Sequence, residues 1–162
     1  MIVVADTSVI INLALVGHEE LLAIIFREVL IPPAVESEFV RLAATDGRFA
    51  GLSVPAWAQV RAPAVIPEAI ANDSDLDDGE MQALALALEI HADGVLIDEA
   101  HGRAVAIELG MVPIGVLGIL VRAKKHGLLP AVAPVIESLL THARFRMADE
   151  LVQTALRLAG EV

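Results

Sequence analysis

The sequence predicts an α/β protein in which a mostly parallel sheet is covered by helices on both faces. Short β-branched runs alternate with longer helical stretches along the 162 residues, and this order is typical of βαβ units. Hydrophobic residues make up 56% of the chain, which is enough for a sizeable core at this length. No internal repeat, low-complexity tract or linker interrupts the pattern, so we expect residues 1–162 to form one domain.

The predicted strands are short apolar runs that end at an acid, a proline or a glycine. The clearest are Ile2–Ala5, Val29–Ile31, Val95–Ile97 and Val112–Ile114. A further candidate, Ala58–Arg61, lies in an irregular, proline-containing stretch from residue 50 to residue 75. Such continuous apolar runs indicate strands that are buried on both faces.

The predicted helices begin at capping residues or prolines and several end at glycines. They are Val9–Val16, Glu19–Phe26, Pro33–Ala44, Gly79–His91, Ala100–Leu109, Val116–His126, Pro130–His142 and Met147–Ala159. The stretch Ala83–Leu88 alternates as a strand would. We interpret it as helix because alanine and leucine are strong helix formers and Asp77 and Asp78 precede it as caps.

The charge is strongly negative and unevenly distributed. The chain carries 22 acidic and 11 basic residues, a formal net charge of −11, and only 3% aromatic residues. This argues against a protein that binds nucleic acid through bulk positive charge or base stacking. Residues 1–100 hold 17 acids and 4 bases, whereas residues 101–162 hold 5 acids and 7 bases. The asymmetry is typical of a cation-binding region beside a polyanion-facing one, or simply of a solvated acidic loop and a solvated basic face.

Two absences narrow the classes further. There is no cysteine, which removes disulfides, thiol catalysis and thiolate metal ligands. The N-terminus has no basic segment before Asp6, and the longest apolar stretch, Leu109–Val121, is too short to span a bilayer. We therefore expect a cytoplasmic protein with no membrane segment.

Acidic residues stand where a parallel sheet places its ligands. Asp6 and Asp98 each follow a predicted strand, and ligands of such sheets bind beyond the carboxyl ends of the strands. Glu36 and Glu38 follow Pro33, and Glu80 lies in the first turn after Asp78. Brought together, Asp6, Glu38, Glu80 and Asp98 would repel one another unless protons or divalent cations neutralised them. Oxygen ligands of this kind suit Mg²⁺ or Mn²⁺.

Each acid also has a purely structural interpretation. Asp6 and Asp98 would serve as caps of the helices that follow them, and the glutamates as partners of helix dipoles. Arg103 would meet a substrate phosphate or pair with Glu99. The five histidines show no metal-like spacing and are interpreted as surface or helix-end groups. The coincidence of four acids, and no single one of them, carries the metal-site hypothesis.

Six segments share an ordered pattern: Val3–Ser8, Ile31–Glu38, Asp78–Ala83, Leu96–Glu99, Gly102–Ala106 and Gly115–Leu120. Together they resemble the corresponding segments of PIN domains, and in particular of a branch related to VapC-type toxins. The resemblance covers almost the full length. The Asp-Thr-Ser start alone is a weak signal, but the ordered set with these spacings is fairly specific.

The resemblance implies a three-layer α/β/α sandwich and a Mg²⁺- or Mn²⁺-dependent ribonuclease. It places the catalytic and metal-binding acids at Asp6, Glu38, Glu80 and Asp98, with Ser8 in support. It also implies a homodimer and a small antitoxin protein as partner. Many members have another acid two residues after the last of the four. Here that position is Ala100, and we expect the adjacent Glu99 to point elsewhere.

The predicted function is hydrolysis of RNA phosphodiesters by a water bound to one or two divalent ions. No nucleophilic side chain is needed for this reaction. The resemblance further implies that the protein is the toxin of a toxin–antitoxin pair. The basic residues predicted to contact RNA phosphates are Arg103, Arg122, Lys124 and Lys125, with Arg144 and Arg146. The alternative is a PIN-like interaction module with weak or no catalysis. A phosphatase of the haloacid dehalogenase type is disfavoured, because Ser8 stands where its second aspartate is needed.

Overall fold

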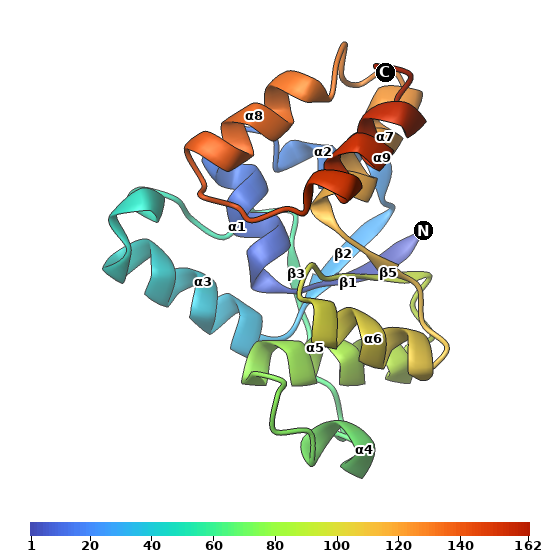
Figure 1. Ribbon diagram of the computed structural model, residues 1–162. Coiled ribbons are helices and arrows are strands. Elements are labelled where there is room, and N and C mark those ends of the chain that lie inside the picture. The colour runs from blue at the N-terminus through green and yellow to red at the C-terminus, as the bar shows by residue number, and fades with distance from the viewer.

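Figure 1 shows the computed structural model of the protein, which describes residues 1–162. A central sheet of five strands has the order β3-β2-β1-β4-β5, and every neighbouring pair is parallel. The strands are β1 (Ile2–Ala5), β2 (Glu28–Ile31), β3 (Gln59–Val60), β4 (Gly94–Leu96) and β5 (Pro113–Ile114). The predicted α/β class and the weak strand candidate near residue 60 are both confirmed.

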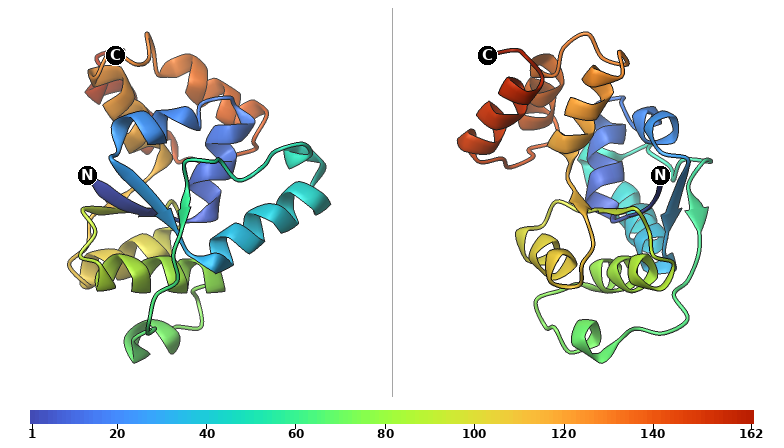
Figure 2. Two further views of the ribbon diagram at one scale, coloured as in Figure 1. Left: turned by 180° about the vertical axis from the view of Figure 1, so that it is seen from behind. Right: turned by 90° about the vertical axis from the view of Figure 1, so that its right-hand side faces the viewer.

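Helices cover both faces of the sheet, as Figures 1 and 2 show. The helices are α1 (Thr7–Leu15), α2 (Glu20–Ile25), α3 (Pro33–Thr45), α4 (Glu68–Ala71), α5 (Asp78–Glu89), α6 (Ala100–Glu108), α7 (Val116–Lys125), α8 (Ala133–Thr141) and α9 (Asp149–Leu158). Helices α1, α2, α7 and α8 bury one face and α9 packs on α7, while α4, α5 and α6 lie on the other face. No helix combines the length and the apolar character needed to cross a membrane.

The strands alternate strictly between the two hydrophobic clusters. In β1, Val3 and Ala5 join the cluster under α1 and α7, whereas Val4 joins the one under α5 and α6. In β4, Val95 and Leu96 divide in the same way. Because successive side chains of a strand point to opposite faces, a sheet covered on both sides needs apolar residues at every position. This is why the strands appear in the sequence as unbroken apolar runs.

The helix boundaries differ from prediction in several places, mostly at ends. Helix α8 begins at Ala133 rather than at Pro130, since the Glu161 carboxylate accepts hydrogen bonds from the N–H groups of Val132 and Ala133 and so fixes that terminus. Helix α5 ends at Glu89 because His91 adopts a positive φ of 51°. Helix α9 begins at Asp149 rather than Met147. Helix α4 and the 3₁₀ turn Gly47–Phe49 were not predicted, and each is only about one turn long.

The topology fixes where a ligand can enter. From β1 the chain builds outward through β2 and β3, and later strands β4 and β5 lie on the other side of β1. The winding therefore reverses between β1 and β4, and the crevice outside their carboxyl ends is where open α/β sheets bind ligands. Asp6 directly follows β1, and Asp98 follows β4 after one residue.

Candidate functional site

Asp6 is a buried carboxylate without a hydrogen-bond partner for one oxygen. Its side chain is only 4% exposed, and Oδ1 has no partner. Although Asp6 occupies the N-cap position of α1, its side chain makes no capping hydrogen bond, so the helix-cap interpretation is wrong. Burial, with smaller contributions from the charges of Asp77, Glu80 and Glu38, raises the pKa of Asp6 to about 8. A carboxylate in this position is stabilised by a proton or a cation.

Asp98 approaches the same crevice from β4. Its Oδ1 accepts a hydrogen bond of 3.1 Å from the N–H of Val116, the first residue of α7, while the buried Oδ2 has no partner. The N-cap of α6 is Glu99, so Asp98 does not cap the helix that follows it. Burial raises the pKa of Asp98 to about 6, against the opposing effects of the Val116 N–H and of Arg103. One oxygen is thus held by α7 and the other is left for a ligand.

Of the two glutamates after Pro33, only Glu38 reaches this crevice. Its Oε2 accepts a hydrogen bond of 2.9 Å from Thr7 Oγ1, which ties α3 to the residue after Asp6. Its Oε1 lies 4.0 Å from Arg41 Nη2. Glu36 lines a different surface depression, bordered by Val40 and Leu52. The spacing of two residues along α3 is enough to turn the two side chains apart.

Glu80 is buried beside the crevice but one of its oxygens is engaged. Asp77 Oδ1 accepts from the N–H of Glu80 at 2.8 Å, and Glu80 Oε2 accepts from the N–H of Asp77 at 2.9 Å. The two residues form a capping box at the start of α5. The pKa of Glu80 is raised, chiefly by burial. Glu80 therefore stabilises the start of its own helix, as its purely structural interpretation predicts.

Asp77 is the acid that sequence reasoning missed as a candidate ligand. Carboxylate oxygens of Asp6, Glu38 and Asp77 lie within 4.8 Å of one another. The sequence showed Asp77 only as a helix cap, and it is one, because the same side chain accepts from the N–H of Glu80. Only the packing of α3 against α5 brings Asp77 next to Glu38. A density of acids around residues 73–80 was the one available signal.

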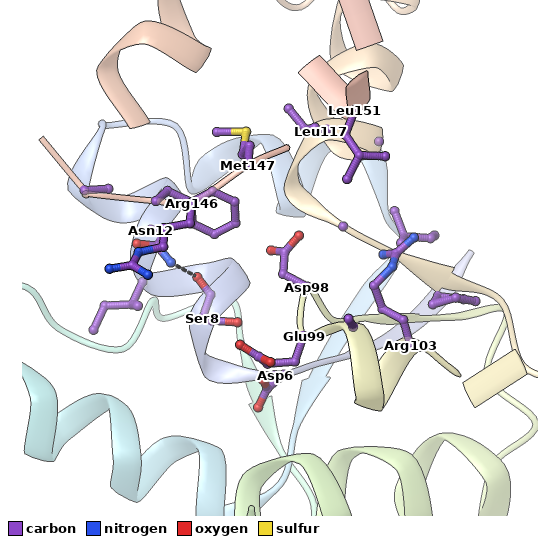
Figure 3. Close-up of a pocket in the computed structure, with 18 of the residues that line it drawn as sticks. Asp6, Ser8, Asn12, Asp98, Glu99, Arg103, Leu117, Arg146, Met147 and Leu151 are labelled. Carbon is purple, nitrogen blue, oxygen red and sulfur yellow. Dashed lines mark hydrogen bonds between the residues drawn. The ribbon is translucent and has the colours of Figure 1, made fainter. Parts of the chain in front are cut away.

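Ser8 lies next to the acids on the first turn of α1. Its Oγ is buried and has no hydrogen-bond partner, and its carbonyl accepts a 2.7 Å hydrogen bond from Asn12 Nδ2. Figure 3 shows Ser8 close to Asp6, on the same side of the crevice as Asn12. Ser8 Oγ, Asp6 Oδ1 and Asp98 Oδ2 are the buried side-chain atoms of the protein that lack partners, and their residues line one groove.

This groove has a volume of about 1060 Å³ and contains both signs of charge. Asp6, Asp98 and Glu99 lie at its centre, Arg103 and Arg146 lie on opposite sides, and Leu117, Met147 and Leu151 lie beyond them (Figure 3). Five arginines line it in total: Arg48, Arg103, Arg122, Arg144 and Arg146. The volume is at the top of the range that small-molecule sites occupy, which favours an extended ligand.

The predicted phosphate-contacting residues separate into two groups. Arg103 and Arg122 line the groove, whereas Lys124 and Lys125 do not. Lys124 Nζ lies 3.2 Å from Glu161 Oε2 and is paired with it. Both lysines stand at the end of α7, about 12 Å along the helix from Val116 at 1.5 Å per residue.

The segment from Ala143 to Ala148 forms one wall of the groove. Arg48 Nη1 donates a 2.8 Å hydrogen bond to the carbonyl of Ala143, while its Nη2 contacts Asp46 Oδ2 at 2.7 Å. Arg144 has a positive φ of 51°, which turns the chain sharply before Phe145. The side chains of Arg144 and Arg146 are exposed, so this wall presents two unpaired positive charges.

One expectation about the start of α6 is wrong, and one of the two alternatives for Arg103 is not found. Glu99 does not point away, because it lines the groove and its charge helps to raise the pKa of Glu80. Arg103 forms no ion pair with Glu99; its Nη1 instead donates to the carbonyl of Ile97 at 3.0 Å. Ala100 lines the groove as well, and it provides no ligand there.

One histidine has a metal-like neighbourhood that its spacing concealed. His101 Nε2 lies 2.8 Å from Asp73 Oδ2, and Asp75 is close to both. The two partners are 28 residues apart in the chain. His101 and Asp75 are exposed, and the pair links α6 to the loop after α4. The expectation that no histidine has such a pairing was therefore wrong, although the ring is on the surface as predicted.

The donor set at the groove fits a hard divalent cation. It consists of carboxylate and hydroxyl oxygens from Asp6, Ser8, Glu38 and Asp98, and Mg²⁺ and Mn²⁺ prefer such ligands. Two of the carboxylates have buried oxygens without partners, and bound cations satisfy such groups. The arrangement could hold a cation and place a phosphodiester between it and the arginines.

Comparison with known proteins identifies the kind of domain. The family model DUF3368, described as a PIN domain, matches residues 2–161. No curated protein and no solved structure matches the chain significantly. The match therefore covers nearly the whole chain, including both acidic strand ends and the arginine-bearing wall.

Proposed function

The chain belongs to the PIN-domain family, and from this premise we propose that it is a divalent-metal-dependent ribonuclease. PIN domains are generally metal-dependent nucleases. The observation that carries the proposal is the convergence of Asp6, Glu38 and Asp98 on one crevice, with oxygens of Asp6 and Asp98 buried and unpartnered. No structural interpretation of Asp6 accounts for its unpartnered oxygen.

Asp6, Glu38 and Asp98, which line the groove, would hold Mg²⁺ or Mn²⁺ with Ser8 Oγ in support, and Glu80, which does not line it, would be the fourth acid. The bound ion would acidify a water and neutralise charge that develops on the phosphate. Thr7 orients Glu38 through its hydroxyl, and the Val116 N–H orients Asp98. Glu80 acts in part through its charge, because Oε2 is bonded to the N–H of Asp77.

The arginines of the groove supply the contacts to RNA. Arg103 lies on α6 beside Asp98 and Arg122 lines the groove from α7, whereas Arg144 and Arg146 lie on the wall formed by residues 143–148. Phosphate contacts position a nucleic acid without reading its sequence. This arrangement explains how a chain with a net charge of −11 can bind RNA, since the bases are concentrated where the scissile phosphate would lie.

A toxin that is paired with a small antitoxin protein and acts as a homodimer is the biological setting we propose. Two features support it. The groove is acidic at its centre, which suits a basic segment of an inhibitor as well as a cation. Exposed apolar residues, Ile107, Val112 and Leu151, lie along the same groove, and exposed apolar patches mark protein interfaces.

A second candidate is a PIN-like module that binds RNA or protein but cleaves poorly. The observation that favours it is Ala100, which lines the groove without a ligand group at the position where many relatives carry an acid. Glu99 lies on the same groove and is the residue that could compensate.

Cleavage of a labelled single-stranded RNA tests the proposal directly. We expect cleavage with Mn²⁺ and none with excess chelator. Asp6→Asn and Asp98→Asn should each lower the rate by at least a hundredfold, because each removes a ligand from the crevice. Glu137→Gln, an exposed carboxylate on α8, is the matched control and should cleave normally. If the wild type cleaves no better than the two aspartate variants, the enzyme proposal fails and the binding module stands.

A further inference from the structure

The first turn of α5 leaves an open space among three carboxylates. A Cβ atom built on Gly79 would lie 3.1 Å from Glu38 Oε2, 3.3 Å from Asp6 Oδ1 and 3.4 Å from Asp77 Oδ1. These oxygens come from α3, from the end of β1 and from the cap of α5. A side chain at residue 79 would therefore come into close contact with all three carboxylates.

The backbone does not require glycine at this position. Gly79 is inside α5 and its φ is not in the left-handed region. The backbone would therefore also allow alanine, which has a higher helix propensity than glycine. The chain therefore has a helix-weakening residue at a buried position where a better one fits the backbone. What alanine would not fit is the space that the three carboxylates border.

We infer that Gly79 keeps open the position of a divalent cation, and that Asp77 is a further carboxylate ligand there beside Asp6 and Glu38. This inference rests on the proposed metal-dependent function and assigns two residues of α5 to it. The ligand would be a hard divalent ion such as Mn²⁺ or Mg²⁺, whose inner waters need room that a methyl group would occupy.

Asp6 provides an observation independent of the acidic cluster itself. Its Oδ1, which borders the space at Gly79, is buried and accepts no hydrogen bond from the protein. A buried carboxylate oxygen without a donor is costly in its charged form unless a cation binds it. The unpartnered Oδ1 of Asp6 therefore borders the same space that a side chain at residue 79 would fill.

The capping hydrogen bond of Asp77 also holds its carboxylate in position to bind a cation. Its Oδ1 accepts from the N–H of Glu80 at 2.8 Å, and this bond fixes the carboxylate beside the space. A carboxylate oxygen has two lone pairs, so Oδ1 can accept that bond and still bind a cation. Asp77 lines the same groove as Asp6 and Glu38.

Substitution of Gly79 separates metal binding from folding. In Gly79→Ala we expect Mn²⁺ affinity, measured by calorimetry on the full chain, to fall at least tenfold. The melting temperature in chelator should change by no more than a few degrees, because the added methyl group requires the carboxylates to shift by only a few tenths of an ångström. The rise in melting temperature that Mn²⁺ causes in the wild type should disappear. Gly118→Ala on α7 is the matched control, since its Cβ would meet nothing closer than 3.6 Å, and it should bind Mn²⁺ normally.

Asp77→Asn provides a second variant that does not depend on the fit of a methyl group. Asparagine retains the acceptor for the N–H of Glu80 and is a good N-cap, so the melting temperature in chelator should be almost unchanged. Mn²⁺ affinity should fall at least tenfold. Wild-type Mn²⁺ affinity in Gly79→Ala would overturn the role of Gly79, and wild-type affinity in Asp77→Asn would overturn the role of Asp77.

Asp6→Asn distinguishes failure of this inference from failure of the proposed function. If Asp6→Asn loses Mn²⁺ binding while Gly79→Ala and Asp77→Asn retain it, the metal-dependent function stands and the present assignment is wrong. If the wild type itself binds no Mn²⁺, both are wrong.

Discussion

At the scale of single residues, the site is defined by carboxylates whose charged form the protein itself does not stabilise. Asp6 and Asp98 are both largely removed from water, and each has one oxygen without a donor. Ordinary structural carboxylates of this chain behave differently. Asp46, next to Arg48, has a lowered pKa because it accepts hydrogen bonds from that residue. The contrast indicates that Asp6 and Asp98 are placed for a ligand rather than for stability.

The burial of Asp6 makes the stability of the metal-free protein depend on pH. The pKa of Asp6 is about 8 in the folded protein, and it is near 3.9 in an unfolded chain. Between these values the folded state retains a proton that the unfolded state loses, so the free energy of unfolding falls as pH rises. Asp6→Asn removes this loss and should be more stable than the wild type at pH 8 in chelator by on the order of 2–4 kcal/mol.

Urea unfolding at pH 5 and pH 8 measures this effect. The advantage of Asp6→Asn should be small at pH 5 and largest at pH 8, and saturating Mn²⁺ should reduce it. Groups remote from Asp6 titrate alike in both proteins, so the difference between the two curves reports on Asp6 together with the acids coupled to it, Asp77, Glu80 and Glu38. An advantage that is independent of pH would mean that Asp6 is not protonated in the folded state.

Gly115 sets the position of Asp98. A Cβ atom at residue 115 would lie 2.6 Å from Asp98 Oδ1 and 3.0 Å from Arg103 Nη1, so Gly115→Ala must displace the carboxylate from the N–H of Val116. We expect a destabilisation of about 1–3 kcal/mol and a loss of cleavage of more than tenfold. Thermal unfolding and cleavage rates measure these. Gly47→Ala, whose Cβ would meet nothing within 4 Å, should change neither.

At the scale of elements, helix α5 combines a terminus and a binding surface. Its capping box uses Asp77 and Glu80, and the same two residues bring negative charge to the crevice. A helix N-terminus favours nearby anions, which offsets part of the repulsion among the acids. The first turn of α5 therefore holds carboxylates together that would otherwise separate.

Because Glu80 both forms the capping box of α5 and brings charge to the crevice, we expect its substitution to weaken metal binding only in part. Glu80→Gln keeps an oxygen that can accept from the N–H of Asp77 and is compatible with a capping box. We expect its melting temperature to stay within a few degrees of the wild type and its Mn²⁺ affinity to fall less than that of Asp6→Asn. Calorimetry on both variants compares them. A loss equal to that of Asp6→Asn would show that Glu80 is a direct ligand.

The elements themselves were predictable where the sequence pattern was local. The strand ends at Asp6 and Asp98, the helix after Pro33 and the alanine–leucine helix all follow from composition and capping. What the pattern did not contain was packing between distant segments. The approach of Asp77 to Glu38 depends on α3 packing against α5, and the pairing of His101 with Asp73 joins residues 28 apart. The start of α8 depends on Glu161, which comes last in the chain.

At the scale of the whole molecule, the charge distribution assigns different tasks to the two parts of the chain. The first 100 residues provide most of the acids, and the last 62 provide four of the five arginines that line the groove. This division was predicted from the sequence. Lys124 and Lys125 were also predicted to contact phosphates, but the structure places them outside the groove. Their proximity to Arg122 in the chain was misleading, because successive residues on a helix face different directions.

The wall that contains Arg144 and Arg146 should control RNA binding without affecting the metal. Both side chains are exposed on the groove and neither forms an ion pair. We expect the double variant Arg144→Ala, Arg146→Ala to have a lower kcat/KM, by roughly ten- to a hundredfold at low salt, with Mn²⁺ affinity unchanged. Each lost phosphate contact with a single strand should also reduce the slope of log affinity against log salt concentration by about 0.7.

The salt dependence of kcat/KM at limiting RNA provides the measurement, because it tests position as well as charge. Lys125→Ala removes the same kind of charge from outside the groove, and its slope should match that of the wild type. If Lys125→Ala and the double arginine variant lose the same slope per charge, RNA follows the net charge of the C-terminal part and not the groove. If only the arginine variant loses slope, the phosphates lie along the wall from Ala143 to Ala148, facing Asp6 and Asp98 across the crevice.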